Sequence, residues 1–142
     1  MNDINSEIVR KVNQWISYGD EDLDLARHAL ILENKCPYRL IAYHAQQCAE
    51  KYLKAYLVYK NIDFPYTHNI RRLLEFCAEK ANWVETIKDA EELTPFAITT
   101  RYPGEEETVT KEEALHAIEV ATKVRKIVRR ALVDEGFNLM GI

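Results

Sequence analysis

The first thirty residues carry one helical pattern, and this pattern limits the possible folds more than any other feature of the chain. Between Ile4 and Glu33, apolar residues recur at spacings of three, four and seven, as in a helix with one buried face. They are Ile8, Val12, Trp15, Ile16, Leu23, Ala26 and Leu30. Gly19 interrupts the pattern only weakly, because one glycine in a helix interior costs about 1 kcal/mol. A single long helix is expected, with any bend at Gly19.

More helical segments follow before residue 100. Pro37 suits the first turn of a helix, and residues 38–60 after it contain no other breaker, so a second long helix is expected there. Shorter helices are expected over residues 69–80 and 83–99, and Pro95 makes the latter less regular. Long helices with short connections pack antiparallel. The chain is therefore predicted to be an all-α, up-and-down bundle of four to five helices.

The last helix begins with a capping box. Thr110 is a favoured N-cap residue and Glu113 follows three positions later, so each side chain can bond the other residue's backbone N–H. Apolar residues then occupy about one third of the helix circumference. The basic residues fall on the other side: Lys123, Arg125, Lys126, Arg129 and Arg130. Solvation and the C-terminal helix dipole explain this basic face without a ligand.

Length and composition fit one domain over residues 1–142. With 142 residues, of which 47% are hydrophobic, the chain can bury one sizeable core. Asp3 and Glu7 stand where a signal peptide would need a positive start, and no apolar run reaches a membrane-spanning length. We therefore expect a cytoplasmic protein that has no membrane partner.

Charge and cysteine spacing argue against several kinds of site. A net charge of -4 disfavours broad, nonspecific binding of nucleic acid, which needs a basic surface, but it leaves room for a local nucleotide site. Cys36, Cys48 and Cys77 lack CxxC spacing, so reduced, buried thiols are expected. His44 and Cys48 are spaced as a metal-binding pair, but no second pair of ligands accompanies them. No metal and no cofactor are expected.

Three acidic residues in the first helix imitate the start of a calcium loop. They are Asp20, Asp22 and Asp24. Leu25 stands where such a loop needs glycine, and Ile31 stands where it needs a bidentate glutamate. We therefore interpret the three carboxylates as a solvated acidic face.

The second helix carries a polar stripe beside its apolar face. His44, Gln47, Lys51 and Lys54 lie within about 80° of arc. A titratable ring, an amide and an ammonium group together suit a ligand with a phosphate and a base edge. The alternative is that these side chains face water, with Glu50 and Lys54 as an ordinary helical ion pair.

A second candidate region is the turn that contains Arg101 and Tyr102. The guanidinium of Arg101 can bind a phosphate in a bidentate manner, and the Tyr102 ring can stack on a base. In the alternative interpretation, Arg101 bonds the exposed carbonyls of a helix end while Tyr102 packs under the loop. The spacing alone favours neither interpretation.

Three segments stand out in order along the chain: YHAQQCAEKYLKA at residues 43–55, THNI at 67–70 leading to two leucines, and TRYP at 100–103. With these segments the chain resembles the HEPN family, whose name refers to a nucleotide-binding domain of higher eukaryotes and prokaryotes. The resemblance implies a bundle of four or five helices that forms homodimers. It also implies binding of a nucleotide or RNA, and partnership with a small nucleotidyltransferase as a toxin and antitoxin pair.

The resemblance also raises an enzymatic alternative. Ribonucleases of this family use an Arg, four to six residues and then a His, with the His in proton transfer and the Arg at the phosphate. Only Arg39 and His44 have this spacing here, and Leu40 stands where an Asn commonly follows the Arg. Five helical steps place Arg39 and His44 about 140° apart. A metal-independent endoribonuclease toxin is therefore one alternative, and a noncatalytic protein-interaction module is another.

Overall fold

The computed structural model describes residues 3–97 and 108–139. Within these ranges the chain forms five helices and no strand. They are α1 (Asp3–Ala29), α2 (Tyr38–Tyr59), α3 (Ile70–Ala78), the 3₁₀ helix η1 (Trp83–Ala97) and α4 (Lys111–Asp134). The prediction of an all-α bundle is confirmed. No helix in the described part of the chain is both long and apolar enough to cross a membrane.

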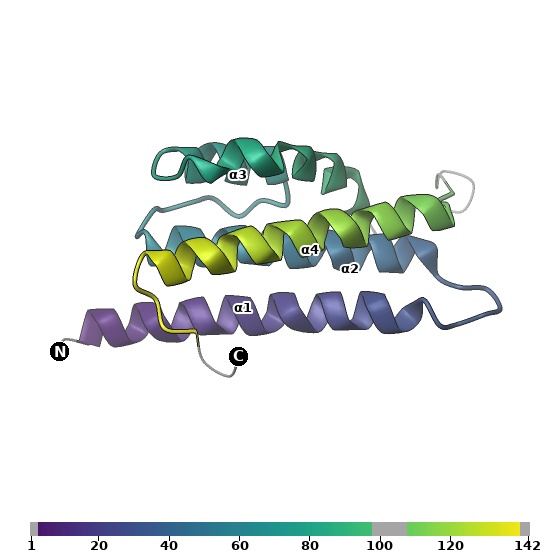
Figure 1. Cartoon of the computed structure of the whole chain (residues 1–142), viewed down its shortest axis with the longest axis horizontal. Helices are drawn as coiled ribbons and strands as arrows, with labels where there is room; N and C mark the ends of the chain where they lie inside the picture. Colours follow the sequence, from purple (N-terminus) through teal and green to yellow (C-terminus); the bar gives the residue numbers. More distant parts are fainter. Residues whose placement is uncertain (1–2, 98–107, 140–142) are drawn as a thin grey trace.

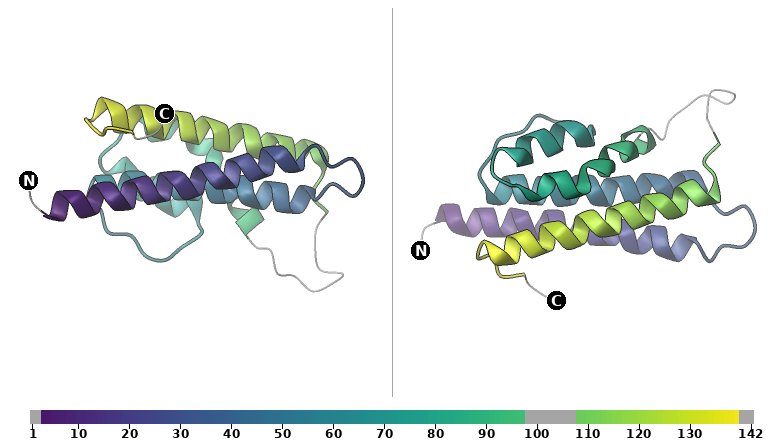
Figure 2. Two further views of the ribbon diagram at one scale, coloured as in Figure 1. Left: turned by 90° about the horizontal axis from the view of Figure 1, so that it is seen from below. Right: turned by 45° about the horizontal axis from the view of Figure 1, so that its top comes forward.

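The three long helices lie along the long axis of the molecule (Figure 1). α1 runs antiparallel to α2 and α4, and α3 and η1 carry the chain back from the end of α2 to the start of α4. α3 and η1 cover the side of α2 that faces away from α1, as both views in Figure 2 show. α2 therefore lies in the middle of the bundle and contacts all four of the other helices.

The central position of α2 explains its unusual pattern of burial. Fourteen of its 22 residues are buried, and four of these are polar. The polar ones are Gln46, Gln47, Glu50 and Lys54. Because a buried polar group is costly without a hydrogen-bond partner, each of these side chains needs a partner inside the bundle.

α1 is one continuous helix through Gly19, and it ends at Ala29, four residues before the end that its apolar pattern predicts. Gly19 is buried where α1 packs against α2. A Cβ atom added at Gly19 would be 3.0 Å from Cδ2 of Tyr52. The absence of a side chain at this position therefore allows the Tyr52 ring to lie between the two helices.

Over residues 83–99 the sequence predicts a helix that Pro95 makes less regular, and η1 is irregular in a different way. It is a 3₁₀ helix, and its non-helical residue is Ile87, with φ -124° and ψ 26°. Pro95 lies eight residues further along, so the irregularity expected from Pro95 is centred elsewhere. Ile87 is completely buried. Burial of the Ile87 side chain in the common core accompanies the departure from helical geometry.

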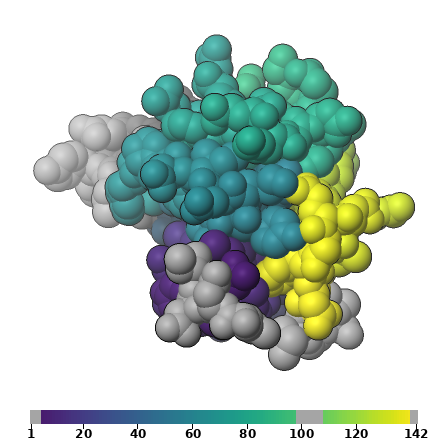
Figure 3. Space-filling view, turned by 90° about the vertical axis from the view of Figure 1, so that its left-hand side faces the viewer, coloured from purple at the N-terminus to yellow at the C-terminus, as the bar shows by residue number. Residues whose placement is uncertain are grey.

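α4 begins with the predicted capping box. The backbone N–H of Glu113 donates to Oγ1 of Thr110 at 3.1 Å, and the backbone N–H of Thr110 donates to Oε1 of Glu113 at 3.0 Å. At its other end, the chain turns back so that Phe137 packs against the Tyr59 ring, with 5.6 Å between ring centroids. This contact joins the segment after α4 to the last residue of α2. Figure 3 shows, from this end of the molecule, the yellow C-terminal part of the described chain beside the blue-teal part that includes the end of α2.

Candidate functional site

A carboxylate on α1 gathers two of the predicted ligand-binding residues of α2. Asp22 is buried, and it lies opposite His44 and Lys51 where the two helices pack. Its Oδ1 is 2.8 Å from Nδ1 of His44, and its Oδ2 accepts a hydrogen bond from Nζ of Lys51 at 2.5 Å. Since a carboxylate only accepts, this hydrogen bond requires a proton on Nδ1 of His44, and Nε2 is the ring nitrogen that Asp22 does not hold. We call these three residues the Asp22 cluster.

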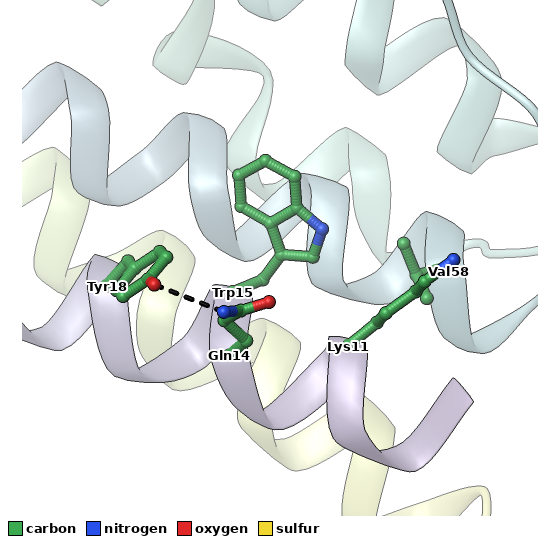
Figure 4. A pocket seen from close by; sticks show the side chains of 5 residues that line it. All are labelled: Lys11, Gln14, Trp15, Tyr18 and Val58. Atoms are coloured by element: carbon green, nitrogen blue, oxygen red, sulfur yellow. Dashed lines mark hydrogen bonds between the residues drawn. The ribbon is translucent and has the colours of Figure 1, made fainter. Parts of the chain in front are cut away.

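A hollow of about 420 Å³ lies further along the same two helices. Its lining comes from both helices: Lys11, Gln14, Trp15, Tyr18 and Val58. Figure 4 shows the Trp15 indole reaching from α1 toward α2, with Tyr18 on one side and Lys11 on the other. Nε2 of Gln14 donates to the Tyr18 hydroxyl at 3.1 Å. We call this space the α1–α2 hollow.

The Asp22 cluster and the α1–α2 hollow are neighbours. Nζ of Lys51 lies 6.0 Å from the centroid of the Tyr18 ring, so one ammonium group contacts both. The Tyr18 side chain is well exposed, and its ring offers a planar surface to a ligand. An exposed ring, an ammonium group and an imidazole therefore lie together on one face of the molecule.

A second polar network lies inside the bundle around Glu50. Its Oε1 accepts a hydrogen bond from Nε2 of Gln46 and lies 2.9 Å from Nδ1 of His68, and its Oε2 accepts from Nζ of Lys54 at 2.9 Å. The Gln46 amide oxygen accepts from Nε2 of Gln47 at 2.8 Å. Glu50 and Lys54 do form the helical ion pair of the alternative interpretation, but the expectation that these two side chains face water is wrong, because both are at most 5% exposed.

Aromatic rings surround the ammonium group of Lys54. Trp15, Phe64 and Tyr66 have ring centroids between 5.4 and 6.0 Å from Nζ. Such contacts stabilise a desolvated cation. Since Phe64 and Tyr66 belong to the connection between α2 and α3, Lys54 fastens this connection to the bundle.

The interpretation of the acidic residues as a solvated face is wrong for Asp22, which is buried, and for Asp20, which belongs to a third network, whereas Asp24 is exposed. Asp20 accepts hydrogen bonds from the Tyr52 hydroxyl and from Nε of Arg125, the latter at 2.7 Å. Its other oxygen is 3.5 Å from Nη1 of Arg129, which also donates to the Tyr52 hydroxyl at 3.0 Å. Burial, together with the hydrogen bond to Asp20, raises the pKa of Tyr52 far above its ordinary value. Asp20 thus joins α1, α2 and α4.

The structure separates the predicted ligand-binding residues. His44 and Lys51 lie together in the Asp22 cluster, whereas Gln47 is buried and bonds to Gln46 in the network around Glu50. Arg101 and Tyr102 lie outside the described residues.

The two residues of the predicted ribonuclease pair lie on different sides of one helix. Arg39 and His44 both belong to regular α2, which places their side chains about 140° apart around the helix. Two such residues within one chain cannot face one phosphate. A ribonuclease site that uses both of them therefore requires a second subunit.

Sequence reasoning missed the acidic partners that orient the histidines. Asp22 and Glu50 each bind a histidine Nδ1, of His44 and His68 respectively. His68 was visible in the THNI segment, but no spacing rule links it to Glu50, which is 18 residues away. In the described part of the chain, no three His, Cys, Asp or Glu side chains are grouped so that they can hold a metal ion.

Comparison with known proteins agrees with the resemblance of the three segments. The HEPN domain model matches residues 12–131. The chain is similar to the crystal structure of ST0689, an archaeal HEPN homologue, at 26% identity and a TM-score of 0.66, covering 85% of this chain and 97% of the other. It is equally similar to TT1696 from Thermus thermophilus, at 25% identity and a TM-score of 0.67, covering 84% and 97%. No curated protein sequence matches the chain. The chain belongs to the HEPN domain family.

Proposed function

We propose that the chain forms a homodimer that binds a nucleotide or an RNA end and acts with a nucleotidyltransferase partner in a toxin–antitoxin module. The observation that carries the proposal is the juxtaposition of the Asp22 cluster and the α1–α2 hollow. Lys51 supplies a positive charge for a phosphate, His44 supplies an imidazole nitrogen, and the exposed ring of Tyr18 supplies a surface for a base. From the sequence alone, the proposal also includes Gln47, Arg101 and Tyr102.

The ion pair in the Asp22 cluster is compatible with ligand binding. Asp22 holds both His44 Nδ1 and Lys51 Nζ, so the two side chains have fixed positions before a ligand arrives. A binding site whose side chains are already ordered loses less entropy when the ligand binds.

The test is a panel of nucleotides and short RNAs in a thermal-shift measurement. A ligand that binds the native state raises stability by about 2.7 kcal/mol when its concentration is a hundredfold above the dissociation constant. Tyr18→Ala and Lys51→Ala should each reduce the shift, and Lys88→Ala, an exposed lysine on η1, should not. Tyr18→Ala removes an exposed ring, so it tests the site even if Lys51→Ala destabilises the fold. If no nucleotide or RNA changes the melting temperature, the proposal is wrong.

The oligomeric state and the partner are tested separately. Light scattering should give twice the mass of one chain. A nucleotidyltransferase encoded next to this gene should copurify with the protein when the two are expressed together. A monomer, or a neighbouring gene of another class, would contradict the corresponding part of the proposal.

The endoribonuclease is a second candidate, and one observation favours it. Asp22 holds Nδ1 of His44 and leaves Nε2 available to exchange a proton, which is the arrangement that orients a general base. Incubation of purified protein with RNA in the presence of chelator tests this function. Cleavage that His44→Ala and Arg39→Ala both abolish would select it, and intact RNA would rule it out.

A further inference from the structure

The basic residues of α4 form two groups once the helix is packed. Arg125 and Arg129 turn toward Asp20 and Tyr52 in the bundle. Lys123, Lys126 and Arg130 turn the other way and line a hollow of about 510 Å³ between α4 and the start of η1. Figure 2 shows η1 and α4 side by side in its right-hand view. We call this space the α4–η1 hollow.

The cations of the α4–η1 hollow are weakly held by the protein. Nζ of Lys123 is 3.9 Å from Asp89, and Nε of Arg130 is 3.7 Å from Asp134, with all four side chains at least 40% exposed. Exposed pairs at such distances contribute little to stability. No ion pair within the described residues involves Lys126. An anion in the hollow can therefore recruit these groups at little cost.

One wall of the α4–η1 hollow is an aromatic ring with a fixed orientation. The Trp83 indole packs edge-on against the buried Tyr56 ring, with 4.9 Å between centroids and 82° between planes. The Thr86 hydroxyl donates to the Trp83 carbonyl at 2.6 Å and holds the first turn of η1. Asp134, the partner of Arg130, also lines the hollow, so its lining carries three cations and one carboxylate. A planar indole beside a net positive charge suits a base together with its phosphate.

We propose that the α4–η1 hollow binds a phosphorylated nucleoside, either a free nucleotide or an unpaired nucleotide of an RNA strand. The base stacks on Trp83, and the phosphate lies between Lys126 and its neighbours Lys123 and Arg130. The volume of the hollow falls within the usual range for small-molecule sites, roughly 300 to 1,000 Å³. The hollow shares no lining residue with the α1–α2 hollow, so it is a separate site and does not rest on the function proposed above.

Fluorescence of Trp83 provides the test. The chain has two tryptophans, so in the Trp15→Phe variant excitation that is selective for tryptophan reports on Trp83 alone. This substitution also alters the α1–α2 hollow. AMP, adenosine, ribose 5-phosphate and a short single-stranded RNA are titrated in turn. AMP or the RNA should quench Trp83, and adenosine and ribose 5-phosphate should bind at least about tenfold more weakly, since each lacks one of the two recognised groups. Quenching by AMP alone identifies a free nucleotide as the ligand, and quenching by the RNA alone identifies a strand.

Variants separate specific binding from general charge effects. Lys126→Ala should weaken binding and, for the RNA, reduce the slope of log affinity against log salt by about 0.7. Lys88 lies on η1 but does not line the hollow, so Lys88→Ala should leave the affinity and the salt slope unchanged. Absence of quenching, equal binding of ribose 5-phosphate and AMP, or no effect of Lys126→Ala would each overturn the proposal. A thermal shift that depends on Tyr18 without any Trp83 response would retain the first site and reject this one.

Discussion

At the scale of single residues, Glu50 is the least exposed charged residue of α2. Its side chain is 3% exposed and accepts hydrogen bonds from Gln46, Lys54 and His68. A buried ion pair can contribute little to net stability, because both charges lose their hydration. Removing only one partner is different, since it leaves the other charge buried without compensation.

The charge of Glu50 is therefore expected to matter more than that of any surface glutamate. Glu50→Gln should lower the free energy of unfolding by about 3 kcal/mol, because Lys54 then remains buried without a counter-charge. Urea denaturation followed by circular dichroism measures the change. In the double variant Glu50→Gln/Lys54→Met the loss should be smaller than in the single variant.

The matched control is the exposed ion pair of Glu7 and Arg10, in which Nη2 of Arg10 lies 2.6 Å from Oε1 of Glu7. Glu7→Gln should leave the urea midpoint within experimental error, because water screens this pair. Equal effects of Glu50→Gln and Glu7→Gln would show that the buried network does not hold the fold together.

At the scale of helices, the approach of α1 to α2 depends on Gly19. Tyr52 crosses from α2 to α1 at this point, and its hydroxyl bonds to both Asp20 and Arg129. These bonds hold the ring in place, so it cannot easily move away from a new atom on α1. Helix propensity therefore favours alanine at position 19, whereas the tight contact with Tyr52 favours glycine.

Gly19→Ala measures which of the two effects is larger. Propensity alone predicts a gain of about 1 kcal/mol, whereas overpacking of a tight contact costs about 1 to 3 kcal/mol. We expect a net loss of about 1 kcal/mol in the free energy of unfolding, measured by urea denaturation. Ser17→Ala, at an exposed position of the same helix, should be neutral or slightly stabilising. A more stable Gly19→Ala variant would mean that the Tyr52 ring shifts freely.

At the scale of the whole molecule, the core contains several weak acids that stay protonated in the folded state. Burial raises the pKa of Cys77 to about 12 and raises the pKa values of Cys48, Tyr52 and Tyr56 further. Nearby carboxylates add to the effect at the last three groups, notably Asp20 at Cys48 and Tyr52, and Glu135 at Tyr56. All four groups lie on α2 or α3, so their protonation is linked to the same core.

The protein should therefore lose stability in alkaline solution. An unfolded thiol releases its proton near pH 9, whereas Cys77 in the fold keeps its proton until about pH 12. The folded state then binds more protons than the unfolded state, so the free energy of unfolding falls as the pH rises above 9. Urea midpoints between pH 7 and pH 11 measure this decline, and Cys77→Ala should make it shallower. A midpoint that stays constant up to pH 11 would contradict the burial of these groups.

Local signals along the chain are enough to predict the long helices and the family. Apolar spacing predicts α1, α2 and α4, and the Thr110 capping box predicts where α4 starts, because both signals depend on residues within a few turns of each other. The segment at residues 43–55 identifies the HEPN family in the same local way. Local signals do not predict the 3₁₀ form of η1. Its departure from helical geometry is at Ile87, which is buried in the common core.

Which polar residues are buried, and which partners they have, depends on how the helices pack together. Asp22 meets His44 and Lys51 because α1 packs against α2, and Lys126 points to the α4–η1 hollow while its neighbour Arg125 points to Asp20. In the sequence these residues look like ordinary solvated charges. The environment of a side chain depends on helices that are distant along the chain, and no local spacing contains that information.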